Sequence, residues 1–161
     1  MIEVQIDIQN NSNSNHVPSE ADFERWAKAA VGEHRDQAEI SVLIVDIDEG
    51  AELNHQWRSK EGPTNVLSFP SDLPPELQLP LLGDLVICAP VVEREAQEQV
   101  KTLESHWALM VVHGTLHLLG YDHIEDDLAE AMESLEITIM KQLGFSDPYQ
   151  INESNSEERG Q

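Results

Sequence analysis

Residues 105–119, with the sequence SHWALMVVHGTLHLL, constrain the fold more than any other part of the chain. If this segment is helical, apolar side chains lie on nearly all of its sides, and such a helix is stable only when it is buried. A chain of 161 residues, of which 40% are hydrophobic, is long enough to build one core around it. The sequence therefore predicts a central buried helix that other elements must cover.

The rest of the chain has patterns typical of short strands and amphipathic helices. Residues 2–8 alternate apolar and polar side chains, as in a strand with one wet face, and 40–45 is a nearly continuous apolar run typical of an interior strand. Two further strands are predicted at 65–69 and 84–89, and helices at 20–31, 49–58, 90–101, 105–119 and 125–143. Strands and helices alternate first and helices cluster last, so we predict an α/β (α+β) fold with about four strands and about five helices.

Neither an internal repeat nor a linker divides the chain. We predict one domain over residues 1–150, followed by a polar, disordered tail over 151–161. A long loop is predicted at 70–83, a segment with four prolines. This loop either flanks a pocket or merely connects two strands.

The charge of the chain is strongly acidic. Its formal net charge is −22, from nine Lys and Arg against 31 Asp and Glu. A general affinity for nucleic acid is disfavoured, because phosphates must be neutralised by cations and a negative field repels a polyanion. Any role with nucleic acid must rest on a local cationic site, a bound metal or a partner that does the docking.

The lack of a long apolar run and the N-terminal sequence predict a soluble cytoplasmic protein with one unpaired cysteine. Cys88 has no second cysteine to pair with, and its apolar surroundings predict a buried structural thiol. The chain lacks an apolar run of the roughly 20 residues that a membrane helix needs. The N-terminus also lacks the basic start and apolar stretch of a secretory signal.

The segment HGTLHLLGYDH, residues 113–123, has the spacing of a metal site. His113 and His117 are four residues apart, so on a helix they project from one face on successive turns. Gly120 can end the helix in a left-handed turn that brings His123 back towards them. Three imidazoles leave a fourth position for water, as in catalytic zinc sites, although they also suit copper, nickel or iron. The alternative is that these are ordinary histidines on a helix face and in a turn.

The same spacing occurs in the metzincin proteases, with one departure. Where those proteases carry the glutamate that acts as general base, this chain has Gly114. Glycine cannot accept a proton, so peptide hydrolysis by that route is disfavoured. Two neighbours have less certain roles: Asp122 either orients a ligand imidazole or belongs to the turn, and His106 is predicted to be a solvated histidine near the helix start.

A second cluster lies in LNHQWRSKEGPTNVLSFP, residues 53–70. Arg58 and Lys60 are two of the nine basic residues, and Asn65 and Ser68 add hydrogen-bonding groups near a strand start. A guanidinium can clamp a phosphate with paired N–H donors. The alternative is that Arg58 pairs with one of the many surface acids.

Together, HGTLHLLGYDH, NHQWRSKEGPTNVLSFP and LLGDLVI resemble the YbeY family of bacterial metal-dependent endoribonucleases, in matching order over nearly the whole chain. The resemblance implies a small mixed sheet packed with helices, and one zinc ion held by His113, His117 and His123. It also implies that Arg58 is functionally important. The implied activity is cleavage of single-stranded RNA in small-subunit ribosomal RNA maturation and ribosome quality control. Asn65 stands where many relatives carry aspartate.

The hypothesis is therefore metal-dependent phosphodiester hydrolysis. A metal would act as Lewis acid and activate water, Arg58 would stabilise charge on the phosphate, and Lys60 would assist as a point charge. The general base is not identified: either the metal activates water directly or the 2′-OH of the RNA attacks. Two other hypotheses remain, a metal-dependent hydrolase of a peptide, ester or amide, and a non-catalytic ribosome-assembly factor with a structural metal. Because of the acidic charge, ribosomal RNA is expected to be delivered by basic partners such as ribosomal proteins.

Overall fold

The computed structural model describes residues 3–32, 37–58, 65–71, 81–121 and 126–145. The predicted tail over 151–161 lies outside these ranges, and the predicted domain boundary at residue 150 therefore stays a prediction. The loop predicted at 70–83 is shorter than expected, because Pro70 and residues 81–83 belong to strands. Residues 72–80 lie outside the described ranges, so the role predicted for that loop stays open.

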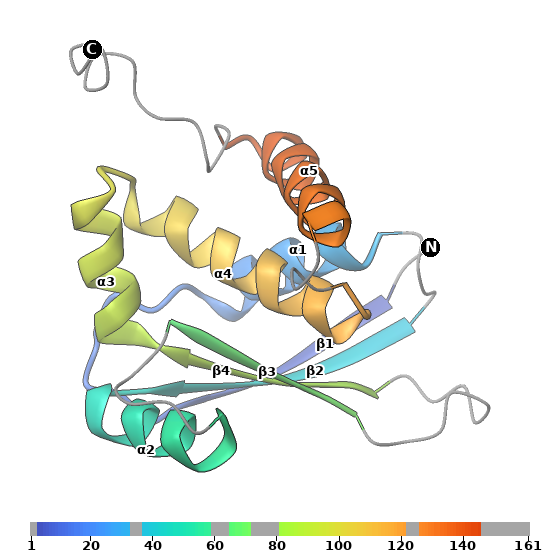
Figure 1. The fold of residues 1–161 in the computed structure, drawn as a ribbon. Coiled ribbons are helices and arrows are strands. Elements are labelled where there is room, and N and C mark those ends of the chain that lie inside the picture. The colour runs from blue at the N-terminus through green and yellow to red at the C-terminus, as the bar shows by residue number, and fades with distance from the viewer. Residues whose placement is uncertain (1–2, 33–36, 59–64, 72–80, 122–125, 146–161) are drawn as a thin grey trace.

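Four strands form one mixed sheet in the order β1-β2-β4-β3 (Figure 1). The strands are β1 (Glu3–Asn10), β2 (Gln37–Val45), β3 (Val66–Pro70) and β4 (Leu81–Cys88). β1 and β4 run parallel to β2, whereas β3 is antiparallel to β4 and forms an edge of the sheet. In β1, Ile6 is buried and its neighbours Gln5 and Asp7 are exposed, as the alternating sequence predicts. The expected small mixed sheet is confirmed.

Five helices occur in the described ranges, and four of them lie on one side of the sheet. They are α1 (Glu20–Val31), α2 (Ile47–Arg58), α3 (Ala89–Glu98), α4 (Leu103–Leu118) and α5 (Asp126–Gln142). Figure 1 shows α1, α3, α4 and α5 over one face and α2 over the other. The α2 helix begins two residues before the position that the sequence predicts, a difference at a helix end that the pattern does not define.

The α4 helix lies at the centre of the main core, as its apolar sequence predicts. Every residue from His106 to Val112 is buried. Trp107 meets Phe23 of α1 edge to face, with ring centroids 5.9 Å apart and an interplanar angle of 85°. The helix begins at Thr102, whose side chain accepts a hydrogen bond from the backbone N–H of Ser105. Packing on several sides therefore fixes α4, which carries two of the predicted metal ligands.

A smaller cluster fills the other face of the sheet beneath α2. Leu53 of α2 packs there against buried Leu67 and Val86 and their neighbours. Cys88 belongs to this cluster and is 1% exposed, which confirms the prediction of a buried thiol. Burial raises the pKa of the Cys88 thiol, so it stays protonated and inert.

None of the helices in the described ranges combines the length and the apolar character needed to cross a membrane.

Candidate metal centre

His113 and His117 lie together near the C-terminal end of α4. Their ring centroids are 4.7 Å apart and the rings meet at 79°. His113 is partly exposed, with 24% of its side chain accessible, and His117 is also half-buried. The four-residue spacing therefore places both imidazoles on one side of the helix and within reach of one small ion.

The α4 helix ends immediately after this pair. The Gly120 N–H donates to the His117 carbonyl and the Tyr121 N–H donates to the Leu116 carbonyl, each at 3.0 Å. This is the Schellman arrangement, and Gly120 adopts a φ of +110° in it. A Cβ at this position would meet nothing within 4 Å, so glycine is needed for its backbone conformation and not for space. The predicted left-handed turn is confirmed, while Asp122 and His123 lie outside the described residues.

Glu136 of α5 joins the site, although the sequence analysis did not select it. Its carboxylate accepts a hydrogen bond from Nδ1 of His113 and is fully buried. Its place on α5 indicates that it is buried, because Glu136 lies four residues after Met132 and four before Met140, both of which are buried. An acid on the apolar face of a helix needs a partner in the protein, and that position could have identified it.

Gly114 has a packing role that explains why no side chain occupies this position. A Cβ on Gly114 would come within 2.7 Å of Leu85 Cδ2 of β4. The Ser68 hydroxyl of β3 donates to the Gly114 carbonyl at 3.3 Å. The position that holds the catalytic base in a metzincin is therefore occupied here by a glycine that lets α4 pack closely against the sheet.

The two predicted basic residues are not brought to the histidines by the described part of the structure. Arg58 is the last residue of α2, and the structure does not describe where its side chain points. Lys60 falls in residues 59–64, which are also outside it. Their roles stay predictions.

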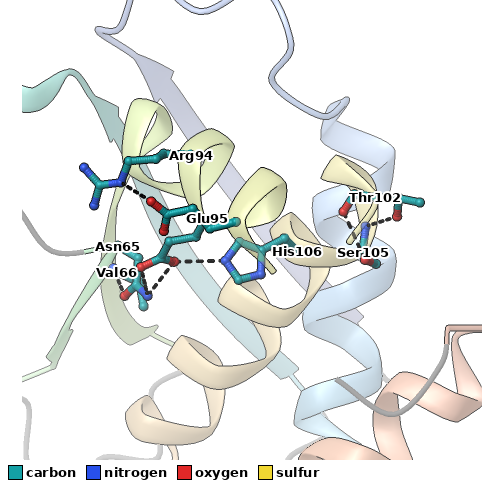
Figure 2. Close-up of polar contacts among 8 residues, drawn as sticks. Asn65, Val66, Arg94, Glu95, Thr102, Ser105 and His106 are labelled. Carbon is teal, nitrogen blue, oxygen red and sulfur yellow. Dashed lines mark hydrogen bonds and ion pairs between the residues drawn. The ribbon is translucent and has the colours of Figure 1, made fainter. Parts of the chain in front are cut away.

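Asn65, where the chain enters β3 after this basic segment, is held by a polar network (Figure 2). Its amide Nδ2 donates to Glu95 Oε1 of α3 at 3.1 Å, and its Oδ1 accepts from the Val66 N–H at 2.6 Å. Glu95 Oε1 also accepts a hydrogen bond from His106 Nε2 at 2.9 Å. The network therefore ties β3 to both α3 and α4.

The prediction that His106 is solvated is wrong. His106 is 2% exposed, because α3 covers the N-terminal half of α4 and Glu95 supplies an acceptor there. Burial lowers the pKa of His106, and the hydrogen bond to Glu95 opposes that effect. Its second ring nitrogen, Nδ1, is buried without a hydrogen-bond partner among the described residues.

The donor set at the end of α4 fits a metal that prefers imidazole. Nδ1 of His113 faces a carboxylate, which leaves Nε2 as the nitrogen that can donate to a cation, and metal-bound histidines in proteins are commonly held in this way. The described ranges contain no complete group of three potential ligands, and the third predicted ligand, His123, lies beyond them. Ligation by all three histidines thus stays a prediction.

Comparisons with known proteins identify relatives of this chain. The family model described as "Endoribonuclease YbeY" matches residues 7–144. A relative of the same name from Cellvibrio japonicus (strain Ueda107) is 56% identical over 150 residues, which are 92% of this chain and 85% of the relative. The solution structure of TM1509 from Thermotoga maritima has a similar fold, with a TM-score of 0.56 and 26% identity over 91% of this chain and 99% of that chain.

Proposed function

The chain belongs to the YbeY family of endoribonucleases, and from this premise we propose that it is a zinc-dependent enzyme specific for single-stranded RNA. An endoribonuclease is a hydrolase that acts on phosphodiester bonds of RNA, and this much follows from the family. Our proposal adds the zinc ion and the preference for single strands. It also adds a place in cytoplasmic small-subunit ribosomal RNA maturation and ribosome quality control.

The observation that carries the proposal is the pair of adjacent imidazoles with a buried carboxylate behind one of them. His113 and His117 have ring centroids 4.7 Å apart, and Glu136 accepts a hydrogen bond from His113. Imidazole donors of this kind suit zinc. His113, His117 and His123 would hold the ion in the proposal. When bound, zinc supplies Lewis acidity towards a phosphate oxygen and makes water a better nucleophile near neutral pH.

The residues of the chain have separate tasks in this scheme. His113, His117 and His123 would hold the ion as three protein ligands, which would leave a fourth position for water or substrate. Arg58 stabilises the negative charge that builds up on the phosphate oxygens, and Lys60 adds a second positive charge. Gly114 cannot act as a base, so the proton of the nucleophile leaves by another route.

Two forms of the reaction give different products. Attack by water leaves no cyclic phosphate on the RNA, whereas attack by the neighbouring 2′-OH passes through a 2′,3′-cyclic phosphate. Analysis of the cleaved ends by mass spectrometry distinguishes these two routes.

The charge of −22 makes partners part of the proposal. A protein this acidic should bind free RNA weakly, because few phosphate contacts can be neutralised. Basic ribosomal proteins would instead attract it and present the RNA. Nanomolar binding of bare single-stranded RNA at physiological salt would contradict the proposal that basic partners present the RNA.

The test compares metal content and RNA cleavage in purified wild type and His117→Ala. The expected result is near-stoichiometric zinc in the wild type, with zinc and cleavage both lost in the variant. Wild-type cleavage that persists after complete removal of metal would overturn the proposal.

A second pair of variants tests Arg58. Arg58→Ala should lower cleavage by about 10²–10³-fold without changing zinc content. Arg94→Ala is the matched control, since Arg94 is 58% exposed on α3 and pairs only loosely with Glu98, at 3.8 Å. Full RNA processing by Arg58→Ala would favour the non-catalytic assembly factor.

A further inference from the structure

Glu136 is a carboxylate in a place where charge is costly. It is 0% exposed on the buried face of α5, beside Met132, Ile139 and Met140. An ionised carboxylate that leaves water loses several kcal/mol of solvation unless charged or hydrogen-bonding partners replace the water. Met, Leu or Ile would fill this position at lower cost, so the charge needs an explanation beyond packing.

The contact with His113 explains how the carboxylate acts. A carboxylate only accepts hydrogen bonds, so the proton between the two groups belongs to Nδ1 of His113. That proton fixes the imidazole tautomer and leaves the lone pair on Nε2. It also fixes the rotation of the ring, because the ring must keep Nδ1 directed at α5.

Exposure shows that Glu136 lies behind His113 and not beside a substrate. The Glu136 side chain is 1% exposed, whereas the His113 side chain is 24% exposed. The neighbouring His117 ring lies on the same side of α4 as His113. A group as buried as Glu136 has no route to an RNA phosphate, so any effect it has on the reaction must pass through His113.

We infer that Glu136 is a positioning residue that holds His113 with Nε2 directed to the metal and makes that nitrogen a stronger donor. This inference rests on the proposed function, because it requires that His113 binds zinc. The buried negative charge of Glu136 then also favours a cation on the far side of the ring.

The competing explanation is a structural one, in which Glu136 and His113 merely join α5 to α4. Both explanations predict that loss of Glu136 changes stability. Only the positioning role predicts that zinc affinity and the tautomer of His113 change as well.

The experiment measures zinc affinity by competition with a chromogenic chelator, and the His113 tautomer by ¹⁵N NMR of the zinc-free protein. Glu136→Gln keeps an acceptor for Nδ1 but removes the charge, and Glu136→Leu removes both. Removing a group behind a metal ligand typically costs about 10–100-fold in affinity, so we expect about 10-fold for Gln and about 100-fold for Leu. Glu133→Gln is the matched control, since Glu133 is exposed on the same helix.

The NMR measurement should show an Nδ1-protonated His113 in the wild type and in Glu136→Gln, and a mixture of tautomers in Glu136→Leu. If Glu136→Leu does not fold, the zinc affinity of Glu136→Gln alone tests the positioning role.

Two results contradict the inference in different ways. If Glu136→Gln and Glu136→Leu bind zinc like the wild type while His113→Ala does not, Glu136 is structural and the zinc site stands. If the wild type itself binds no zinc, the proposed function fails, and the role of Glu136 fails with it.

Discussion

Two histidines on α4, seven residues apart, each meet a glutamate from a neighbouring helix, and the two pairs have opposite patterns of burial. In the first pair, the His106 side chain is 2% exposed and Glu95 is 22% exposed. In the second pair, the His113 side chain is 24% exposed and Glu136 is 1% exposed. The imidazole is the buried member of the first pair, and the carboxylate is the buried member of the second pair.

We interpret the first pair as structural and the second as part of the proposed metal centre. A buried imidazole with a partly exposed acid joins two helices and presents no ring nitrogen to solvent, and Nδ1 of His106 has no partner among the described residues. A half-exposed imidazole with a buried acid presents its second nitrogen outward, which suits a metal ligand. Which member of the pair is buried is therefore more informative than the pair itself.

The largest expected difference is in RNA cleavage. His113→Ala should lower cleavage by more than about 100-fold, since even groups behind a metal ligand cost about 10–100-fold. His106→Ala should keep cleavage within a few-fold of wild type when both are assayed at low temperature, where both are folded. Equal losses of activity in the two variants would remove the distinction between the pairs.

The second difference is in stability, where we expect the substitution at His106 to cost more than the substitution at His113. His106→Ala should lower the free energy of unfolding by about 2–3 kcal/mol, since it opens a cavity and takes a donor from Glu95. His113→Gln should cost less, because that side chain is partly hydrated and Gln can still donate to Glu136. Urea unfolding of the zinc-free proteins measures both, and a larger cost at His113 would contradict the assignment of the structural pair.

Gly114, next to His113, should show a smaller loss. Gly114→Ala places a Cβ within 2.7 Å of Leu85 Cδ2, so α4 or Leu85 must move. We expect a loss of about 1–2 kcal/mol from overpacking, together with weaker zinc binding as the ligand helix shifts. Leu85→Ala in the same chain should restore part of the zinc affinity, and its failure to do so would separate this contact from the metal centre.

The smallest effect is on the pH dependence of stability, and it concerns His106. Burial lowers its pKa in the folded protein, although Glu95 opposes the shift and Lys101 adds to it. The unfolded chain therefore binds more protons below about pH 6.5, and the stability from neutral His106 is present above that pH and lost as the pH falls towards the folded pKa. Between about pH 7.5 and about pH 5.5 the wild type should lose more stability than His106→Gln. Equal losses would show that the burial of His106 does not shift its pKa.

The fold was more predictable than the site because the pattern of apolar residues determines where most helices and strands form. Segment 105–119 has apolar side chains on nearly all of its sides, which indicates a buried helix, and the short, nearly continuous apolar run at 40–45 is typical of an interior strand. Gly120 was predicted correctly because left-handed conformations strongly favour glycine. Helical spacing correctly predicted that the rings of His113 and His117 lie close together.

The parts that were missed depend on contacts between distant segments. Glu136 lies on the apolar face of α5, which indicates that it is buried, but it is 23 residues after His113 and the sequence does not show that His113 is its partner. His106 was misjudged because its position near the helix start says nothing about α3 covering it. The positions of the His123, Arg58 and Lys60 side chains relative to the imidazoles stay predictions, because these side chains lie outside the part of the chain that the structure describes.

The most direct test of the central claim is zinc-edge X-ray absorption on wild type and His113→Ala, each loaded with equimolar zinc. For the wild type we expect three imidazole nitrogens and one oxygen at about 2.0–2.1 Å. The number of imidazoles should fall in His113→Ala and remain unchanged in His106→Ala. A wild-type spectrum without imidazole scattering, or one that His113→Ala leaves unchanged, would contradict a metal centre at the end of α4.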